Sequence, residues 1–263
     1  MIIYPDNCKF DKPIIIDTHA HLDDQKFDQI RDELLTQMSL NGIDKIISCG
    51  CDAESSKTAI DLAEKYDFIY AAVGIHPENL ESGTSLSPIR DLLKYKKCVA
   101  IGEIGLDYYW HSDNKLLQKE IFEQQILLAK EYNLPVIVHD REAHEDTLNI
   151  LLKHKPKGVL HCFSGSVETA RELLKIGMYI GVGGVITFKN AKRLPEVVEM
   201  IPDDRFLLET DCPYLAPEPY RGKTCHSGLI PLTAEKIAFY RKTTVQDILL
   251  KAKSNAEKLF NFL

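Results

Sequence analysis

The chain alternates short apolar runs with longer segments of helical periodicity, and this alternation restricts the possible folds more than any other feature. Eight runs are rich in β-branched residues or leucine, and each is followed by a stretch with the apolar spacing of an amphipathic helix. Such repetition is typical of consecutive βα units, which build a parallel sheet. The runs occupy residues 13–21, 45–50, 68–77, 98–108, 135–140, 158–165, 178–184 and 205–211.

Eight successive βα units predict an α/β fold, a single-domain (β/α)8 TIM barrel over residues 1–263. The length of 263 residues agrees with the roughly 250 that such a barrel needs. No linker or low-complexity tract divides the chain, which favours one closed barrel over two domains. Residues 114–133 predict an outer helix. Residues 231–262 predict two final helices, with Thr243 or Thr244 as the N-cap between them.

Composition restricts the functional class. A formal net charge of −7 argues against a broad nucleic-acid surface, so any phosphate recognition must be local. Seven cysteines, at 8, 49, 51, 98, 162, 212 and 225, do not form the pattern of a disulfide framework and indicate a reducing compartment. The first residues contain only a short apolar stretch, which predicts neither a signal peptide nor a membrane span. We therefore expect a cytoplasmic protein.

Side chains that bind metals or transfer protons gather where the predicted strands end. The active sites of such barrels lie at the carboxyl ends of the strands, so polar residues there favour a functional interpretation. These residues are Asp17, His19 and His21 in the first run, Glu103 and Asp107 in the fourth, His139 in the fifth, His161 in the sixth, and Glu209 and Asp211 in the eighth.

A first metal position is predicted around the HxH motif. His19 and His21 are two residues apart on a strand, so both imidazoles face the same side and suit one ion. The motif alone is weak, because buried histidines often only form hydrogen bonds. Glu103 could bridge two ions through its two oxygens, although a buried salt bridge is the alternative. Asp211 could ligate the first ion and serve as general base, or cap a helix before Pro213.

His139 and His161, on successive strands, could complete a second metal position. Mixed nitrogen and oxygen ligands suit Zn, Mn, Fe or Co, and Mg less naturally. Two divalent ions about 3.5–4 Å apart would share a water molecule and lower its pKa toward about 7. The sequence therefore predicts a hydrolase with two divalent ions as cofactors, in which Asp211 and Glu103 are catalytic.

Four further residues are candidates for substrate binding. Arg141 could bind a phosphate through its guanidinium group, or form a salt bridge at a helix start. His76 could donate a hydrogen bond to substrate, orient a ligand, or be structural. Asp107 could hydrogen-bond a ligating histidine or cap the following loop. Ser164 could donate to a phosphate oxygen, although serine before glycine is common in turns.

The aromatic run at residues 108–110 could stack on nucleobases or cover the barrel as a hydrophobic lid. Cys49 and Cys51 are too few for a structural zinc site and are expected to be packed thiols. Cys162 and Cys212 each neighbour a candidate ligand, and strand alternation predicts that they point away from the metals.

Taken together, the motifs DTHAHLDD, GIHPEN, GEIGLDYYW, PVIVHDREA, HCFSG and LLETDCPYLAP resemble the TatD family of metal-dependent deoxyribonucleases, within the amidohydrolase-like barrels. The resemblance covers nearly the whole chain. It implies that one ion is held by His19, His21, Glu103 and Asp211, and the other by Glu103, His139 and His161. It further implies Mg- or Mn-dependent phosphodiester hydrolysis on DNA, with 3′ to 5′ exonuclease behaviour in some members, while related members remove D-amino acids from tRNA.

One segment departs from the family pattern. The family often carries an RGKRNEP-like sequence after the aspartate motif, whereas this chain has RGKTCHSG, with Cys225 and His226. In the family this loop borders the mouth of the barrel. The difference weakens inferences about substrate fit and leaves the predicted metal ligands unchanged.

The leading hypothesis is a phosphodiesterase whose partner is DNA, single-stranded or with free ends, without a membrane or an obligate protein partner. The alternative is an amide or ester hydrolase on the same site, such as a D-aminoacyl-tRNA deacylase. Cyclic-amide hydrolases often bridge their ions with a carboxylated lysine where this chain has Glu103. A non-enzymatic binding protein is disfavoured because all six candidate ligands are present.

Overall fold

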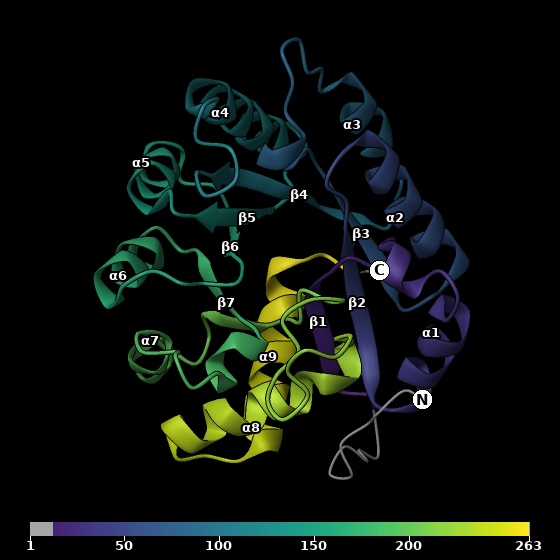
Figure 1. The fold of residues 1–263 in the computed structure, drawn as a ribbon, viewed down its shortest axis with the longest axis vertical. Coiled ribbons are helices and arrows are strands. Elements are labelled where there is room, and N and C mark those ends of the chain that lie inside the picture. The colour runs from purple at the N-terminus through teal and green to yellow at the C-terminus, as the bar shows by residue number, and fades with distance from the viewer. Residues whose placement is uncertain (1–12, 263) are drawn as a thin grey trace.

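The computed structural model describes residues 13–262, in which eight parallel strands are surrounded by helices (Figure 1). The strands are hydrogen-bonded in chain order from β1 to β8, and each predicted apolar run overlaps one of them. The predicted TIM barrel is therefore confirmed. The strands are β1 Ile15–Ala20, β2 Ile43–Cys49, β3 Ile69–Val73, β4 Cys98–Asp107, β5 Val136–Arg141, β6 Gly158–Leu160, β7 Tyr179–Val182 and β8 Phe206–Leu208.

The helices follow the strands as the periodicity predicts. The helix predicted at 114–133 is α4, and the two final helices are separated at Thr244, whose hydroxyl accepts the Asp247 N–H at 3.1 Å. The helices are α1 Arg31–Leu40, α2 Ala53–Lys65, α3 Ser87–Leu92, α4 Lys115–Glu131, α5 His144–His154, α6 Val167–Lys175, α7 Leu194–Met200, α8 Ile230–Arg241 and α9 Val245–Leu259; four short 3-10 turns are η1 Gln25–Phe27, η2 Pro77–Asn79, η3 Gly184–Thr187 and η4 Ser227–Leu229.

The barrel interior is packed with side chains at its amino-terminal end. Alternate strand residues point inward, and Ile47, Ile137 and Leu207 are among those in the interior cluster. The end of α9 closes this side of the barrel, because Leu259 and Phe260 belong to the same cluster. The ionisable side chains of the candidate centre therefore enter the interior near the carboxyl ends of the strands.

Backbone hydrogen bonds beyond the end of β8 close the ring onto β1. The Asp211 N–H donates to the His19 carbonyl at 3.0 Å, and the His21 N–H donates to the Cys212 carbonyl at 2.8 Å. A parallel bridge also pairs Ala20 with Cys212. This closure brings Asp211 beside the HxH motif, although the two lie far apart in the sequence.

Several predicted strands extend too far, and two of these strands lead into candidate ligands. β6 ends at Leu160 and β8 at Leu208, so His161 and Asp211 lie just beyond them. The backbone then turns into left-handed conformations, with φ of 43° at Cys162 and 61° at Asp211. Simple strand alternation therefore does not set the directions of these side chains.

Cys8 lies outside the described residues. Within residues 13–262, no helix has the length and apolarity needed to cross a membrane.

Candidate metal centre

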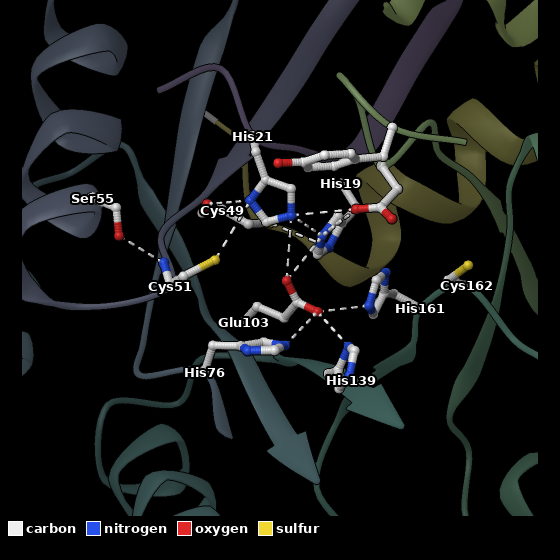
Figure 2. A network of polar contacts seen from close by, with 12 residues as sticks. His19, His21, Cys49, Cys51, Ser55, His76, Glu103, His139, His161 and Cys162 are labelled. Carbon is white, nitrogen blue, oxygen red and sulfur yellow. Dashed lines mark hydrogen bonds and ion pairs between the residues drawn. The ribbon is translucent and has the colours of Figure 1, made fainter. Parts of the chain in front are cut away.

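Six residues predicted as metal ligands converge at the carboxyl end of the barrel, around the carboxylate of Glu103 (Figure 2). Glu103 is 3% exposed and lies on β4. Its neighbours come from β1, from β5 and from the segments that follow β6 and β8. The six are His19, His21, Glu103, His139, His161 and Asp211.

The first group of donor atoms surrounds Glu103 Oε2. His19 Nε2 and His21 Nε2 lie 3.1 Å apart, and they are 3.3 Å and 3.4 Å from Glu103 Oε2. Asp211 Oδ1 lies 3.6 Å and 3.3 Å from the same two nitrogens. Four tetrahedral ligands with bonds of about 2.0–2.2 Å would be separated by about 3.3–3.6 Å. The His19, His21 and Asp211 atoms are therefore close enough together to hold a single cation, and Glu103 Oε2 lies at similar distances from the two histidines.

The ring nitrogens of the HxH motif are oriented for ligation. His21 Nδ1 lies 3.0 Å from the Cys49 carbonyl oxygen, which can only accept, so Nδ1 carries the proton and the Nε2 lone pair faces Glu103. His19 Nδ1 lies 3.5 Å from the Cys49 sulfur. Cys51 Sγ lies 3.7 Å from His21 Nδ1. The two thiols expected to be packed thus line the outer side of both histidines.

The second group surrounds Glu103 Oε1. His139 Nδ1 lies 2.9 Å and His161 Nε2 lies 2.8 Å from this oxygen. The His161 ring stacks on that of His19, with centroids 3.9 Å apart. The two oxygens of Glu103 therefore face different donor groups, which is the arrangement expected of a carboxylate that bridges two ions.

Asp107 orients His139 and also fixes the loop after β4. Its Oδ2 lies 3.0 Å from His139 Nε2, so this nitrogen donates, and Nδ1, which faces Glu103, is the nitrogen that would offer its lone pair to a bound cation. Its Oδ1 accepts the backbone N–H groups of Tyr109 and Trp110, both at 2.9 Å. Asp107 therefore both hydrogen-bonds a candidate ligand and caps the following loop, the two alternatives considered from the sequence.

His76 lies in the centre but presents a proton to it. Its Nδ1 accepts the Glu78 N–H at 3.2 Å, which places the ring proton on Nε2. That nitrogen lies 3.6 Å from Glu103 Oε1, and the ring meets that of His139 edge to face at 4.4 Å. His76 is thus better suited to donate a hydrogen bond than to ligate a cation.

Burial and mutual charge set the protonation states of the centre. Burial and the charge of His161 lower the pKa of His19 to about 4, and burial with His139 lowers the pKa of His76 to about 3. Burial would raise the pKa of Glu103, but the surrounding imidazoles hold it well below its usual range. Glu103 is therefore an anion and His19 is neutral at neutral pH, the forms in which these groups bind cations.

His139 holds a proton in the centre. Burial would lower its pKa, but hydrogen bonds to Asp107 and Glu103 raise it to about 10. A cation bound at Glu103 Oε1 would displace the proton that His139 shares with that oxygen, because ligands bind metals in their deprotonated form.

Glu209 is a buried carboxylate beside the centre, which the sequence placed among the strand-end residues without a specific role. Its Oε1 accepts the backbone N–H of Cys162 and lies 3.8 Å from His161 Nδ1. Burial raises its pKa to about 7. Gly181 leaves room for it, since a Cβ there would approach Glu209 Oε2 to 2.5 Å. Glu209 lies two residues after the inward-facing Leu207, and this spacing in the sequence could have indicated that its side chain also points into the barrel.

Two candidate substrate residues lie outside the donor cluster. Arg141 is exposed, and among the described residues it has no carboxylate partner; its guanidinium lies over the rings of Tyr109 and Trp110 at 4.2 Å and 5.3 Å. The salt bridge considered for it is therefore not formed. Ser164 is exposed in the turn after β6. Cys162 points away from Glu103 (Figure 2), as expected, although it lies beyond the strand end.

The loop that departs from the family pattern buries its unusual residues. Cys225 is 0% and His226 is 6% exposed, and the Cys225 N–H donates to the Pro213 carbonyl at 3.0 Å. Both residues line a cavity of about 330 Å³ between this loop and α1, together with Phe27 and Leu34. The two residues that differ from the family pattern are therefore buried beside this cavity.

A family model described as TatD related DNase matches residues 16–261 of this chain. The chain belongs to the TatD family. Within this family, it is 43% identical to the Bacillus subtilis protein named uncharacterized metal-dependent hydrolase YabD, over 94% of this chain and 99% of that protein. It is 35% identical to the Escherichia coli protein named uncharacterized metal-dependent hydrolase YcfH, over 94% and 96% of the two chains.

A solved structure extends the likeness of this TatD family member to three dimensions. The crystal structure of YjjV, a TatD homologue from Escherichia coli, superposes with a TM-score of 0.87 at 32% identity, covering 95% of this chain and 98% of that one. Family, relatives and the grouped donor atoms agree on a metal-dependent hydrolase.

Proposed function

We propose that this TatD family member hydrolyses phosphodiester bonds in DNA with two divalent ions. The observation that carries the proposal is that the two carboxylate oxygens of Glu103 face different pairs of histidines. Oε2 faces His19 and His21, and Oε1 faces His139 and His161. A shared carboxylate between two donor groups is suited to paired ions, which supply positive charge at a scissile phosphate and acidify a water molecule. The family described as DNases supports the choice of substrate.

Different residues of the chain would bind the ions, accept a proton and contact the phosphate. His19, His21, Asp211 and Glu103 would hold one ion, and Glu103 with His139 and His161 the other. Asp211 directs Oδ1 toward the histidines, so Oδ2 is the atom proposed to take a proton from the attacking water. The Nε2–H of His76 offers a hydrogen bond to an oxygen on the phosphate.

Charge around the mouth supports local recognition of a phosphate backbone. Cations are exposed on the segments that end or follow β5, β7 and β8, whereas acidic side chains surround a hollow near β1 and β2. A polyanion would pass over the first side and avoid the second. The cations are Arg141, Lys189, Lys192, Arg193, Arg221 and Lys223; the acids are Asp23, Asp24, Asp52 and Glu54.

The test is nucleotide release from a labelled single-stranded oligonucleotide by purified protein supplied with Mg, Mn or Zn. We expect release by the wild type and a loss of at least about 100-fold in Glu103→Gln and Asp211→Asn, because each removes a donor from the centre. Asp61→Asn, at an exposed carboxylate on α2, is the control and should match the wild type. Hydrolysis of an aminoacyl ester or an amide, with no action on the oligonucleotide, would refute the proposal.

A further inference from the structure

Tyr109 and Trp110 form an exposed aromatic pair at the mouth of the barrel. Their side chains are 56% and 59% exposed, and their rings meet at 87° with centroids 4.7 Å apart. The exposure argues against the hydrophobic lid considered from the sequence, because a lid would bury these rings. Exposed aromatic surface of this kind is instead typical of a binding surface.

The pair is held in a fixed position next to the metal centre. Both backbone N–H groups donate to Asp107 Oδ1, and the other oxygen of Asp107 contacts His139 Nε2. One side chain therefore separates the aromatic pair from a candidate metal ligand. A molecule that reaches the centre from this side must pass these rings.

Arg141 completes the surface with a positive charge. Its guanidinium lies 4.2 Å from the Tyr109 ring centroid, while β4 and β5 are joined here by the Tyr108 N–H donating to the Arg141 carbonyl at 2.9 Å. A guanidinium that stacks through its face keeps its N–H groups available at its edge. Ring faces beside such an edge fit a ligand that is both flat and anionic.

We propose that Tyr109, Trp110 and Arg141 form a stacking site for an unpaired nucleobase, with Arg141 binding the adjoining phosphate. The inference rests on the proposed function, which it extends from the scissile bond to the neighbouring nucleotide. Aromatic and guanidinium faces are the groups on which single-stranded bases stack, with little dependence on sequence. A base paired within a duplex has no free face to offer, so the site selects single strands and frayed ends.

Trp110 is the only tryptophan of the chain, so its fluorescence reports on this site alone. The probe is a thymidine phosphorothioate tetranucleotide, which resists hydrolysis, compared with an abasic oligomer of the same backbone. With the metal-loaded wild type we expect the thymidine oligomer to quench the fluorescence and the abasic oligomer not to. Equal quenching by both, or by neither, would overturn the proposal.

Kinetics provide the second readout. Trp110→Ala should raise KM for single-stranded DNA by about 5- to 100-fold and remove the preference over an abasic substrate, with a smaller effect on kcat. Trp110→Phe, which keeps a ring, should retain most of the affinity. Phe239→Ala, at an exposed ring on α8, is the matched control and should be unchanged. An unchanged KM in Trp110→Ala would refute the stacking site.

The two proposals fail in different ways. If the wild type releases nucleotides while Trp110→Ala is indistinguishable from it, the stacking site is refuted and the proposed function remains. If the wild type releases none while thymidine oligomers still quench Trp110, the phosphodiesterase is refuted and base binding stands.

Discussion

The buried carboxylate of Asp17 binds Thr210 twice, accepting its backbone N–H at 3.0 Å and its hydroxyl at 2.6 Å. Asp17 lies two residues before His19, the first residue of the HxH motif, and Thr210 directly precedes Asp211. The pair therefore fixes Asp211 relative to His19 where the barrel closes without a regular ladder. Burial raises the pKa of Asp17 to about 6, and the Thr210 hydroxyl opposes that rise.

Thr210→Val tests this coupling, because it removes the hydroxyl and leaves the shape. We expect the free energy of unfolding to fall by about 1–3 kcal/mol, the usual cost of leaving a buried acceptor unsatisfied. Metal affinity should fall as well, since Asp211 loses its support. Urea unfolding and metal titration measure the two effects. Thr36→Val, at an exposed position on α1, should change stability by less than about 0.5 kcal/mol.

Asp107→Asn should weaken metal binding without touching a ligand. The amide can present its NH₂ to His139 Nε2, which would then accept and leave a proton on Nδ1, the nitrogen that faces Glu103. We expect metal affinity to fall about 10- to 100-fold. Isothermal titration with Zn or Mn gives the affinity. Asp61→Asn, on α2, is again the control, and equal affinity in both variants would exclude an orienting role for Asp107.

Much of the centre was predictable because barrel topology converts sequence order into position. Residues at the carboxyl ends of parallel strands meet at one end of the barrel, so Glu103, His139 and the HxH motif had to be near one another. Inward alternation from Ile137 leads directly to His139. The convergence of Glu103, His139 and the HxH motif follows from these two rules.

Details that depend on tertiary contacts were not predictable. The tautomer of His76 follows from the Glu78 backbone N–H in a 3-10 turn, and a sequence gives no sign of that contact. Cys49 is a packed thiol as expected, but the sequence did not show that Cys49 and Cys51 contact the histidines. They do so because β2 lies beside β1. The left-handed backbone at Asp211 likewise follows from how the ring closes.

Removal of metal should lower the melting temperature. Ions that bind the folded state stabilise it by about 2.7 kcal/mol at one hundred times their dissociation constant. For a chain of this size we expect a chelator to lower Tm by about 5–10 °C. Differential scanning calorimetry on Zn- or Mn-loaded protein measures the shift. Glu103→Gln should show a much smaller response, and an equal response in both proteins would contradict a shared role for Glu103.

His144 gives stability a pH dependence outside the donor cluster. Its Nδ1 lies 2.7 Å from Asp140 Oδ2, and this hydrogen bond raises the pKa of His144 above its ordinary value. The stabilisation is therefore complete below the unfolded pKa of about 6.5 and is lost as pH rises through the higher folded value. Because the side chain is 38% exposed, we expect only about 0.2–1 kcal/mol.

His144→Asn isolates this contribution, since asparagine can still donate to Asp140 but cannot titrate. The wild type should be more stable than the variant near about pH 5.5, and the difference should vanish toward about pH 9. Urea unfolding in the presence of chelator at each pH removes any contribution from metal release. A difference that grows with pH would show that His144 stabilises the fold as a neutral group, and the charge-assisted hydrogen bond to Asp140 would have to be abandoned.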